Sequence, residues 1–385
     1  MNTAKISNYN RLIAFFLIIV ALLSVLVVSA KGWQNDYVPK EENGDSSSNN
    51  EDNNQNEPPP ETPTAPEPET PKFYHHITGV EVNEASYGDS QVAYVLDGNS
   101  PLCGIAGCNL LIEFPIENGK TRYIMITDKG ADLAKIGSIT YSRRFMSNLA
   151  APFGATIISL GNDDYIEYDH IDASSYTVDL QKNPGSYYTE YTYFTYTSTK
   201  LITQAILSAS RVQAILPYGF KENAELSLGA ISAESINIPY DSSTSLVYLP
   251  AQKQYCLCKV GSDKVDVSTF QQVTFTNVLV LYADSMTFET ASQTQLIMNT
   301  LGSGNGFFAC GGVAEKISWS MSADGNLSLL NQSGEKLQIS RGNTYIAYVK
   351  SSKSNISLFQ SQPPLQVVVC TSPSRAYYWQ SLKAH

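Results

Sequence analysis

Short runs of β-branched and aromatic residues, bounded by glycine, asparagine or aspartate, recur along the chain from Phe73 onward. Such runs are typical of β-strands that end in turns. Between the second and third of these runs, the residues Glu117 to Lys120 (ENGK) predict a hairpin turn. The clearest runs are residues 91–97, 108–116, 121–127, 155–161 and 273–282.

Helical periodicity is limited to two segments in the first half of the chain. Residues 141–150 form one of them, and residues 199–209 form the other. In the second segment Leu201, Ile202 and Ala205 share one face behind a Ser or Thr cap. From about Glu225 onward the sequence contains almost only short strand patterns and turns.

The difference between the two halves predicts an α+β fold made of two closely packed subdomains. A mixed α/β N-terminal subdomain is expected over residues 73–225, and a β-rich C-terminal subdomain over residues 226–350. We expect no single sheet to run through both halves. Residues 351–385 are treated as a C-terminal extension.

An unbroken apolar run of 19 residues occupies positions 12–30. As a helix it would be about 28 Å long, which matches the hydrocarbon thickness of a bilayer. We expect an uncleaved membrane anchor, with Lys5 and Arg11 in the cytoplasm and the rest exported. The alternative is a signal peptide cleaved after Ala30. No cysteine at the end of the run offers a site for lipid attachment.

Residues 31–72 have the composition of a disordered stalk. They contain ten acids, three bases and eight of the 18 prolines, and almost nothing that could be buried. The Pro-rich second half favours extended polyproline II structure. The stalk carries most of the chain's net charge of −11, which leaves residues 73–385 only mildly acidic.

The composition excludes several classes of function. An excess of 36 acids over 25 bases argues against a nucleic-acid partner, which requires a basic face. The four histidines include only one, His170, that lies well inside the chain, so we predict no metal site and no cofactor. The same shortage argues against a Ser-His-Asp hydrolase. The glycine-rich segment 302–306 lacks the Lys-Ser/Thr of a phosphate-binding loop and predicts a turn.

Six cysteines in an exported chain permit disulfides. Cys103 and Cys108 are close enough in sequence to close a small loop, whereas Cys256 and Cys258 face one side of a strand. Buried, unpaired thiols are the alternative. The spacings fit a zinc site poorly.

Charged residues that interrupt the apolar strands of the first half are the candidate site. We hypothesise that they line one polar patch, because a hairpin would bring Glu113 or Glu117 opposite Arg122. No catalytic residue is assigned. The patch is either a structural ion-pair network or a cleft that binds a sugar or an anionic polymer. The candidate binding residues are Asp97, Asn99, Glu113, Glu117, Arg122 and Arg143.

Alternating tyrosine and threonine over residues 187–199 form the most unusual segment. This alternation favours a strand packed on the domain. Exposed tyrosines could also stack on sugar rings or contact a partner protein.

Several segments follow one another in the order seen in a known family. HITGV (76–80), QVAYVLDGN (91–99), PLCGIAGCNLLIEFPIENGKTR (101–122) and IGSITYSR (136–143) correspond to its N-terminal motifs. NVLVLY, GSGNG, ISW and GNTYIAYV correspond to its C-terminal half. Over about residues 75–350, the sequence resembles the YerB-like lipoprotein family, bacterial envelope proteins without assigned chemistry.

The chain departs from that family at positions that bear on a polar site. A plain hydrophobic segment stands where the family has a lipid-anchored cysteine. Asn109 replaces an acid, Ser138 replaces a proline and Thr140 replaces an arginine. Any polar site that the family shares would therefore be reduced in this chain.

Anchor, stalk and resemblance together predict a membrane-tethered extracytoplasmic envelope protein. We expect a single-pass protein of the bacterial cell membrane, of Gram-positive type, with its globular part outside. Its expected role is a non-enzymatic binding or scaffold module acting on wall polymer or a wall-synthesis protein. The alternative is a wall- or polysaccharide-processing enzyme that uses Asp97, Glu113 or Glu117 as acid and base.

Overall fold

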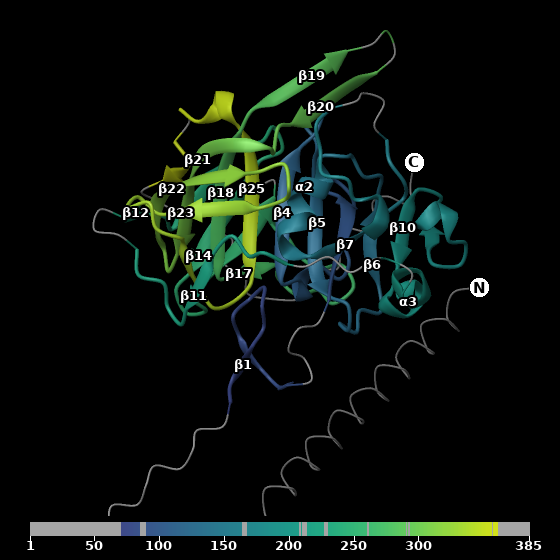
Figure 1. The fold of residues 1–385 in the computed structure, drawn as a ribbon, viewed down its shortest axis with the longest axis horizontal. Coiled ribbons are helices and arrows are strands. Elements are labelled where there is room, and N and C mark those ends of the chain that lie inside the picture. Colours follow the sequence, from purple (N-terminus) through teal and green to yellow (C-terminus); the bar gives the residue numbers. More distant parts are fainter. Residues whose placement is uncertain are drawn as a thin grey trace, which may run out of the picture. The chain divides into compact units, whose positions relative to one another are not determined.

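The computed structural model describes residues 71–84, 90–163, 168–207, 209, 214–226, 230–259, 262–289, 291, 293–355 and 357–360 (Figure 1). The expected membrane segment, nearly all of the expected stalk, and Cys370 lie outside these residues. Within them, no helix has the length and apolarity needed to cross a membrane.

One sheet of 14 strands forms the centre of the fold. Its long path runs β12 (Ile231–Ser232), β22 (Val313–Met321), β21 (Gly302–Cys310), β18 (Asn277–Ala283), β25 (Thr344–Lys350), β4 (Leu110–Pro115), β5 (Thr121–Asp128), β3 (Gln91–Asp97), β6 (Ile136–Ile139), β10 (Phe194–Thr197) and β9 (Tyr188–Glu190). Three strands pair beside this path: β23 (Leu327–Leu330), β7 (Ala155–Ser159) and β8 (Thr177–Asp179).

The two halves of the chain meet inside this sheet, where β25 pairs in parallel with β4. The prediction of two subdomains without a common sheet is therefore wrong. Both strands are buried almost throughout. Each therefore requires a paired strand along both of its edges and packed side chains on both of its faces. The change in composition near residue 225 marks where helices stop, and the sheet continues beyond it.

A smaller sheet covers one face of the large one. Its strands are β16 (Ser262–Asp263), β15 (Gln254–Lys259), β14 (Thr244–Leu249), β13 (Ser235–Ile238), β26 (Phe359–Gln360) and β17 (Thr274–Phe275). Leu246 and Leu257 of this sheet share a buried apolar cluster with Leu111 and Tyr345 of the large sheet. The opposite face of the large sheet carries a second cluster, which includes Phe114, Phe145 and Trp319.

Three two-stranded sheets complete the strands: β1 (Phe73–Tyr74) with β2 (Glu81–Val82), β11 (Gly219–Lys221) with β24 (Gln338–Ser340), and β19 (Ser285–Glu289) with β20 (Thr294–Met298). The β19–β20 pair extends from the body as an arm, at the top of Figure 1. Within the described ranges, the helices are α2 (Met146–Ala150) and α3 (Thr199–Leu207), and the short 3-10 turns are η2 (Ile105–Gly107), η3 (Ala151–Phe153), η4 (Ser174–Tyr176), η5 (Leu180–Lys182) and η6 (Ser351–Lys353).

The local predictions fare better than the division into subdomains. The five strand runs and the helix beginning at Thr199 are present, and the hairpin at residues 117–120 joins β4 to β5. The fold is strand-rich with few helices. The helix expected over 141–150 begins only at Met146, because Ser142 is held in an extended bridge to Asn162. Cys103, Cys108 and Cys310 are buried thiols without disulfides.

A buried ion pair fastens the smaller sheet to the large one beside the seam. Glu113 of β4 is fully buried and accepts hydrogen bonds from Lys259 Nζ at 2.9 Å and from the Tyr345 hydroxyl at 2.6 Å. Lys259 of β15 also donates to Thr121 Oγ1 at 2.7 Å. Each charge thus depends on the other for compensation in a largely buried environment.

The Lys259→Met substitution should therefore lower the free energy of unfolding by about 3–5 kcal/mol, because it leaves Glu113 buried without its cation. The double variant Glu113→Gln/Lys259→Met should lose less than the single variant, since no buried charge remains. Urea unfolding of the single variants and the double variant measures the coupling. Additive losses would mean that the two groups do not stabilise each other.

Candidate functional site

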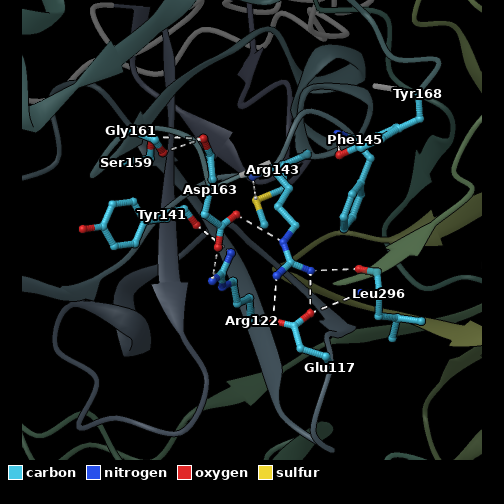
Figure 2. Close-up of polar contacts among 12 residues, drawn as sticks. Glu117, Arg122, Tyr141, Arg143, Phe145, Ser159, Gly161, Asp163, Tyr168 and Leu296 are labelled. Carbon is cyan, nitrogen blue, oxygen red and sulfur yellow. Dashed lines mark hydrogen bonds and ion pairs between the residues drawn. The ribbon is translucent and has the colours of Figure 1, made fainter. Parts of the chain in front are cut away.

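Arg143 is the centre of the polar network in the first half of the chain. It lies between β6 and α2, and its side chain is only 3% exposed. Its Nη1 and Nη2 donate to the two carboxylate oxygens of Glu117 at 2.8 and 2.7 Å. Its Nε donates to Asp163 Oδ1 at 3.2 Å. Figure 2 shows the guanidinium between the two carboxylates.

The same ion pair binds the main chain of the β19–β20 arm. Arg143 Nη1 donates to the carbonyl oxygen of Leu296 at 2.8 Å, and the Leu296 amide donates to Glu117 Oε2 at 3.2 Å (Figure 2). Glu117 and Arg143 thus satisfy both polar backbone groups of one residue of β20. The contact fixes the arm to the β4–β5 hairpin without requiring another strand.

A second arginine continues the network. Arg122 of β5 donates to Asp163 Oδ2 at 2.8 Å and to the carbonyl oxygen of Tyr141 at 2.9 Å (Figure 2). Asp163 therefore accepts from both arginines through different oxygens. The row Glu117, Arg143, Asp163, Arg122 alternates in sign, and its formal charges cancel.

Electrostatics hold Glu117 and Arg143 in their charged forms. Burial alone would raise the pKa of Glu117, but the hydrogen bonds and the charge of Arg143 hold it below its ordinary value. Burial alone would lower the pKa of Arg143, but its carboxylate partners Glu117 and Asp163 raise it. Glu117 is thus an ionised acceptor, and it has no proton to donate as a general acid near neutral pH.

The single polar patch hypothesised from the sequence is divided in the structure. Glu117, Arg122 and Arg143 lie together. Glu113 faces Tyr123 across the hairpin, whereas Arg122 faces Phe114, so Glu113 and Arg122 lie on opposite faces of the sheet. The predicted hairpin is present, but the predicted pairing of Glu113 with Arg122 is wrong by one residue.

Asp97 and Asn99 form no hydrogen bond with the described residues of the network. Asp97 is opposite Arg122 in the strand register, yet its carboxylate accepts from the Asn99 amide and from the Ser100 hydroxyl in its own turn. The Asn99 side chain is exposed. The two residues close a turn, and Arg122 takes Asp163 as its acid.

A pocket of about 420 Å³ adjoins the Glu117 end of the network. The β4–β5 hairpin, the segment 239–241 and the β19–β20 arm form its walls, and Glu117 and Leu296 contribute to them. Three lysines also line it: Lys120, Lys350 and Lys353. We call it the lysine pocket. Arg143 itself borders a second cavity of about 360 Å³, with Arg144 and His170.

Sequence reasoning missed Asp163 and these lysines. Asp163 follows β7 in an acidic loop that carries no hydrophobic pattern, so its spacing gave no sign of a partner. The lysines come from a hairpin and from the end of β25, which are far apart in the sequence. Only the pairing of β25 with β4 brings them to one place.

Comparisons with known proteins agree with the fold described above. Residues 236–346 match the family model described as protein of unknown function (DUF3048), C-terminal domain. The crystal structure of YerB protein from Bacillus subtilis superposes with a TM-score of 0.59 at 17% identity, covering 72% of this chain and 97% of that chain. The fold of this chain is similar to that of YerB. None of the curated proteins matches it.

The YerB-like resemblance seen in the sequence motifs is thereby confirmed. The matched DUF3048 region includes Leu296 but ends before Lys350, and the four charged residues of the network precede it. The comparisons therefore establish the fold. They assign no chemistry to the network or to the lysine pocket.

Asn109, where the YerB-like motif has an acid, has a defined role in this chain. Its Nδ2 donates to Asp128 Oδ1 at 3.1 Å, beside donors from Gln91 and His75. Burial alone would raise the pKa of Asp128, but these hydrogen bonds, that of His75 first, hold it below its ordinary value. The amide thus supports a charge that an acid at the same position would oppose.

Arg143→Ala should lower the free energy of unfolding by about 3–5 kcal/mol, because it leaves Glu117 and Asp163 without their shared cation. Arg143→Lys should recover only part of this loss, since an ammonium group cannot bind Glu117 in the bidentate geometry. Chemical denaturation measures both variants, with Lys200→Ala on the exposed face of α3 as the control. Equal stability of Arg143→Lys and the wild type would contradict the geometric argument.

Asn109→Asp should destabilise the fold by about 1–3 kcal/mol at pH 7, because it removes a donor and sets two carboxylates side by side. The repulsion raises the folded-state pKa of the pair, so the deficit relative to wild type should shrink as the pH falls from 7 to 5. In the wild type, the pKa of Asp128 is lower in the folded state than in the unfolded state, where it is about 4. This difference stabilises the fold at a pH above the unfolded-state pKa, and the stabilisation is lost as the pH falls through the folded-state pKa.

Urea unfolding at both pH values measures these effects. Asn355→Asp, the same change on an exposed turn, serves as the control. A deficit that is constant with pH would show that the introduced carboxylate and that of Asp128 do not interact.

Proposed function

We propose that this protein is a membrane-tethered extracytoplasmic envelope protein whose globular part binds an anionic wall polymer in the lysine pocket. One observation carries the proposal. Lys120, Lys350 and Lys353 converge on one pocket, although residues 73–385 as a whole are mildly acidic. A concentration of positive charge in a concave site attracts polymers that bear phosphate or carboxylate groups.

The charges around the pocket support an anionic ligand. Among the described residues, none of the three lysines forms an ion pair. Glu117 lies in the wall, but Arg143 neutralises its charge. Asp241 is then the one other carboxylate among the lining residues, so cationic groups outnumber acidic ones at the surface that a ligand would contact.

The state of the carboxylates favours binding over catalysis. Glycoside cleavage requires one protonated and one ionised carboxyl group facing the same bond. Glu117 is ionised and fully engaged by Arg143 and the Leu296 amide, and Glu113 is buried on the other face of the sheet. The alternative of a carboxylate-dependent enzyme therefore lacks a suitable acid among these residues.

The proposed location rests on the sequence. The apolar run at 12–30 and the acidic, Pro-rich segment at 31–72 favour an anchor and a spacer, and the YerB-like resemblance favours a bacterial envelope of Gram-positive type. A spacer of this composition would hold the globular part within reach of the wall. A wall-synthesis protein remains the alternative partner for the same pocket.

Binding of the full-length chain to purified cell walls tests the proposal. The triple variant Lys120→Gln/Lys350→Gln/Lys353→Gln should bind at least about tenfold more weakly, since each charged contact contributes roughly 0.5 kcal/mol. Wild-type binding should weaken with rising salt. The triple variant Lys200→Gln/Lys253→Gln/Lys336→Gln makes the same change in net charge on exposed lysines elsewhere and should bind like wild type.

Equal loss in both triple variants would overturn the role of the pocket. Release of soluble wall fragments by wild type, abolished by Glu117→Gln, would overturn the non-enzymatic assignment.

A further inference from the structure

The turn between β9 and β10 presents aromatic rings that neither the network nor the lysine pocket uses. Tyr191 is 72% exposed and Tyr193 is 71% exposed, and Tyr188 beside them is also exposed. Burial normally removes such rings from water, because each carries a large apolar area. Two nearly bare rings at the tip of one turn therefore require an explanation. We call residues 188–194 the tyrosine turn.

The backbone of the tyrosine turn is strained. Tyr191 and Thr192 have φ values of 52° and 67°, in the left-handed region, and the Tyr193 amide donates to the Glu190 carbonyl oxygen at 3.4 Å. These features describe a type I′ turn, for which Asn-Gly is the favoured pair. A β-branched threonine is especially unfavourable there. The turn thus contains tyrosine and threonine in place of the favoured Asn-Gly pair.

Aromatic contacts and an ion pair support the tyrosine turn. The Tyr193 and Phe194 rings pack edge to face at 4.4 Å, and Phe194 also contacts the Tyr191 ring. Next to the turn, Lys135 Nζ binds both carboxylate oxygens of Glu190 at 2.8 Å. These contacts restrict the motion of the exposed rings, so a ligand would remove less side-chain conformational entropy on binding.

We propose that the tyrosine turn is a stacking site for the pyranose rings of an uncharged glycan. The apolar faces of a pyranose can lie on tyrosine rings while its hydroxyls reach the phenol and threonine hydroxyls around them. The surroundings favour this ligand over a protein. Thr189 and Thr192 flank the rings and are exposed, so the apolar surface is too small and too divided for the core of a protein interface.

This inference goes beyond the lysine pocket, because it concerns a different surface and a ligand without charge. Binding at the turn should be insensitive to salt, whereas binding at the lysine pocket should weaken with salt. The two proposals can therefore fail independently.

Isothermal titration calorimetry of the full-length chain with a hexamer of β-1,4-linked N-acetylglucosamine tests the inference, with cellohexaose as a second uncharged probe. Wild type should bind at least one of them. Tyr191→Ala/Tyr193→Ala should bind roughly tenfold more weakly. Phe270→Ala is the matched control, because Phe270 is 69% exposed and also has a positive φ of 60°. It should bind like wild type.

A second variant separates binding from folding. Tyr191→Asn/Thr192→Gly introduces the favoured turn pair and removes one ring, so it should raise the midpoint of thermal unfolding while weakening glycan binding. A loss of binding in a more stable protein cannot result from misfolding.

Three outcomes would overturn the inference. Wild type could bind neither probe, the tyrosine variants could bind as well as wild type, or the Lys120→Gln/Lys350→Gln/Lys353→Gln variant could abolish binding of the uncharged probes. If the tyrosine variants instead lost only the capture of a membrane protein, the turn would be a protein-docking site and the glycan proposal would fail.

Discussion

The guanidinium of Arg143 is the constraint on which the arrangement of the site depends. A buried arginine requires hydrogen-bond acceptors and a counter-charge nearby. Four acceptor atoms bind four of its five N–H donors, and they come from the β4–β5 hairpin, the loop after β7 and the β19–β20 arm. Segments that are distant in the sequence are thereby held to one another, and the position of the arm determines one wall of the lysine pocket.

Alternation of charge within this network has a consequence for the surface around it. Because the formal charges of Glu117, Arg143, Asp163 and Arg122 sum to zero, the network adds no net charge beside the pocket. The lysines at the rim are then free to set the sign of the potential there. The paired charges of the network and the lysines of the pocket thus lie side by side, and among the described residues no carboxylate forms an ion pair with those lysines.

The sequence predicted those features that depend on neighbouring residues. Strand runs, the hairpin at 117–120 and the helix beginning at Thr199 are local, and each is present. The common sheet was missed because it depends on the pairing of β25 with β4, which no local pattern encodes. The grouping of Glu117, Arg122 and Arg143 was anticipated, but Glu113 was misplaced, since a shift of one residue moves a side chain to the opposite face of a strand. Asp163 carried no periodic signal at all.

The parallel seam between β25 and β4 also determines the order in which the fold can be completed. Glu113 and Tyr345, which touch across the seam, are 232 positions apart in the sequence. A chain that emerges from its N-terminus presents β4 long before its neighbour exists, so one edge of a buried, largely apolar strand remains unpaired until almost the last described strand arrives. During that interval the open edge can pair with another chain. The central sheet is therefore complete only after β25 has paired with β4.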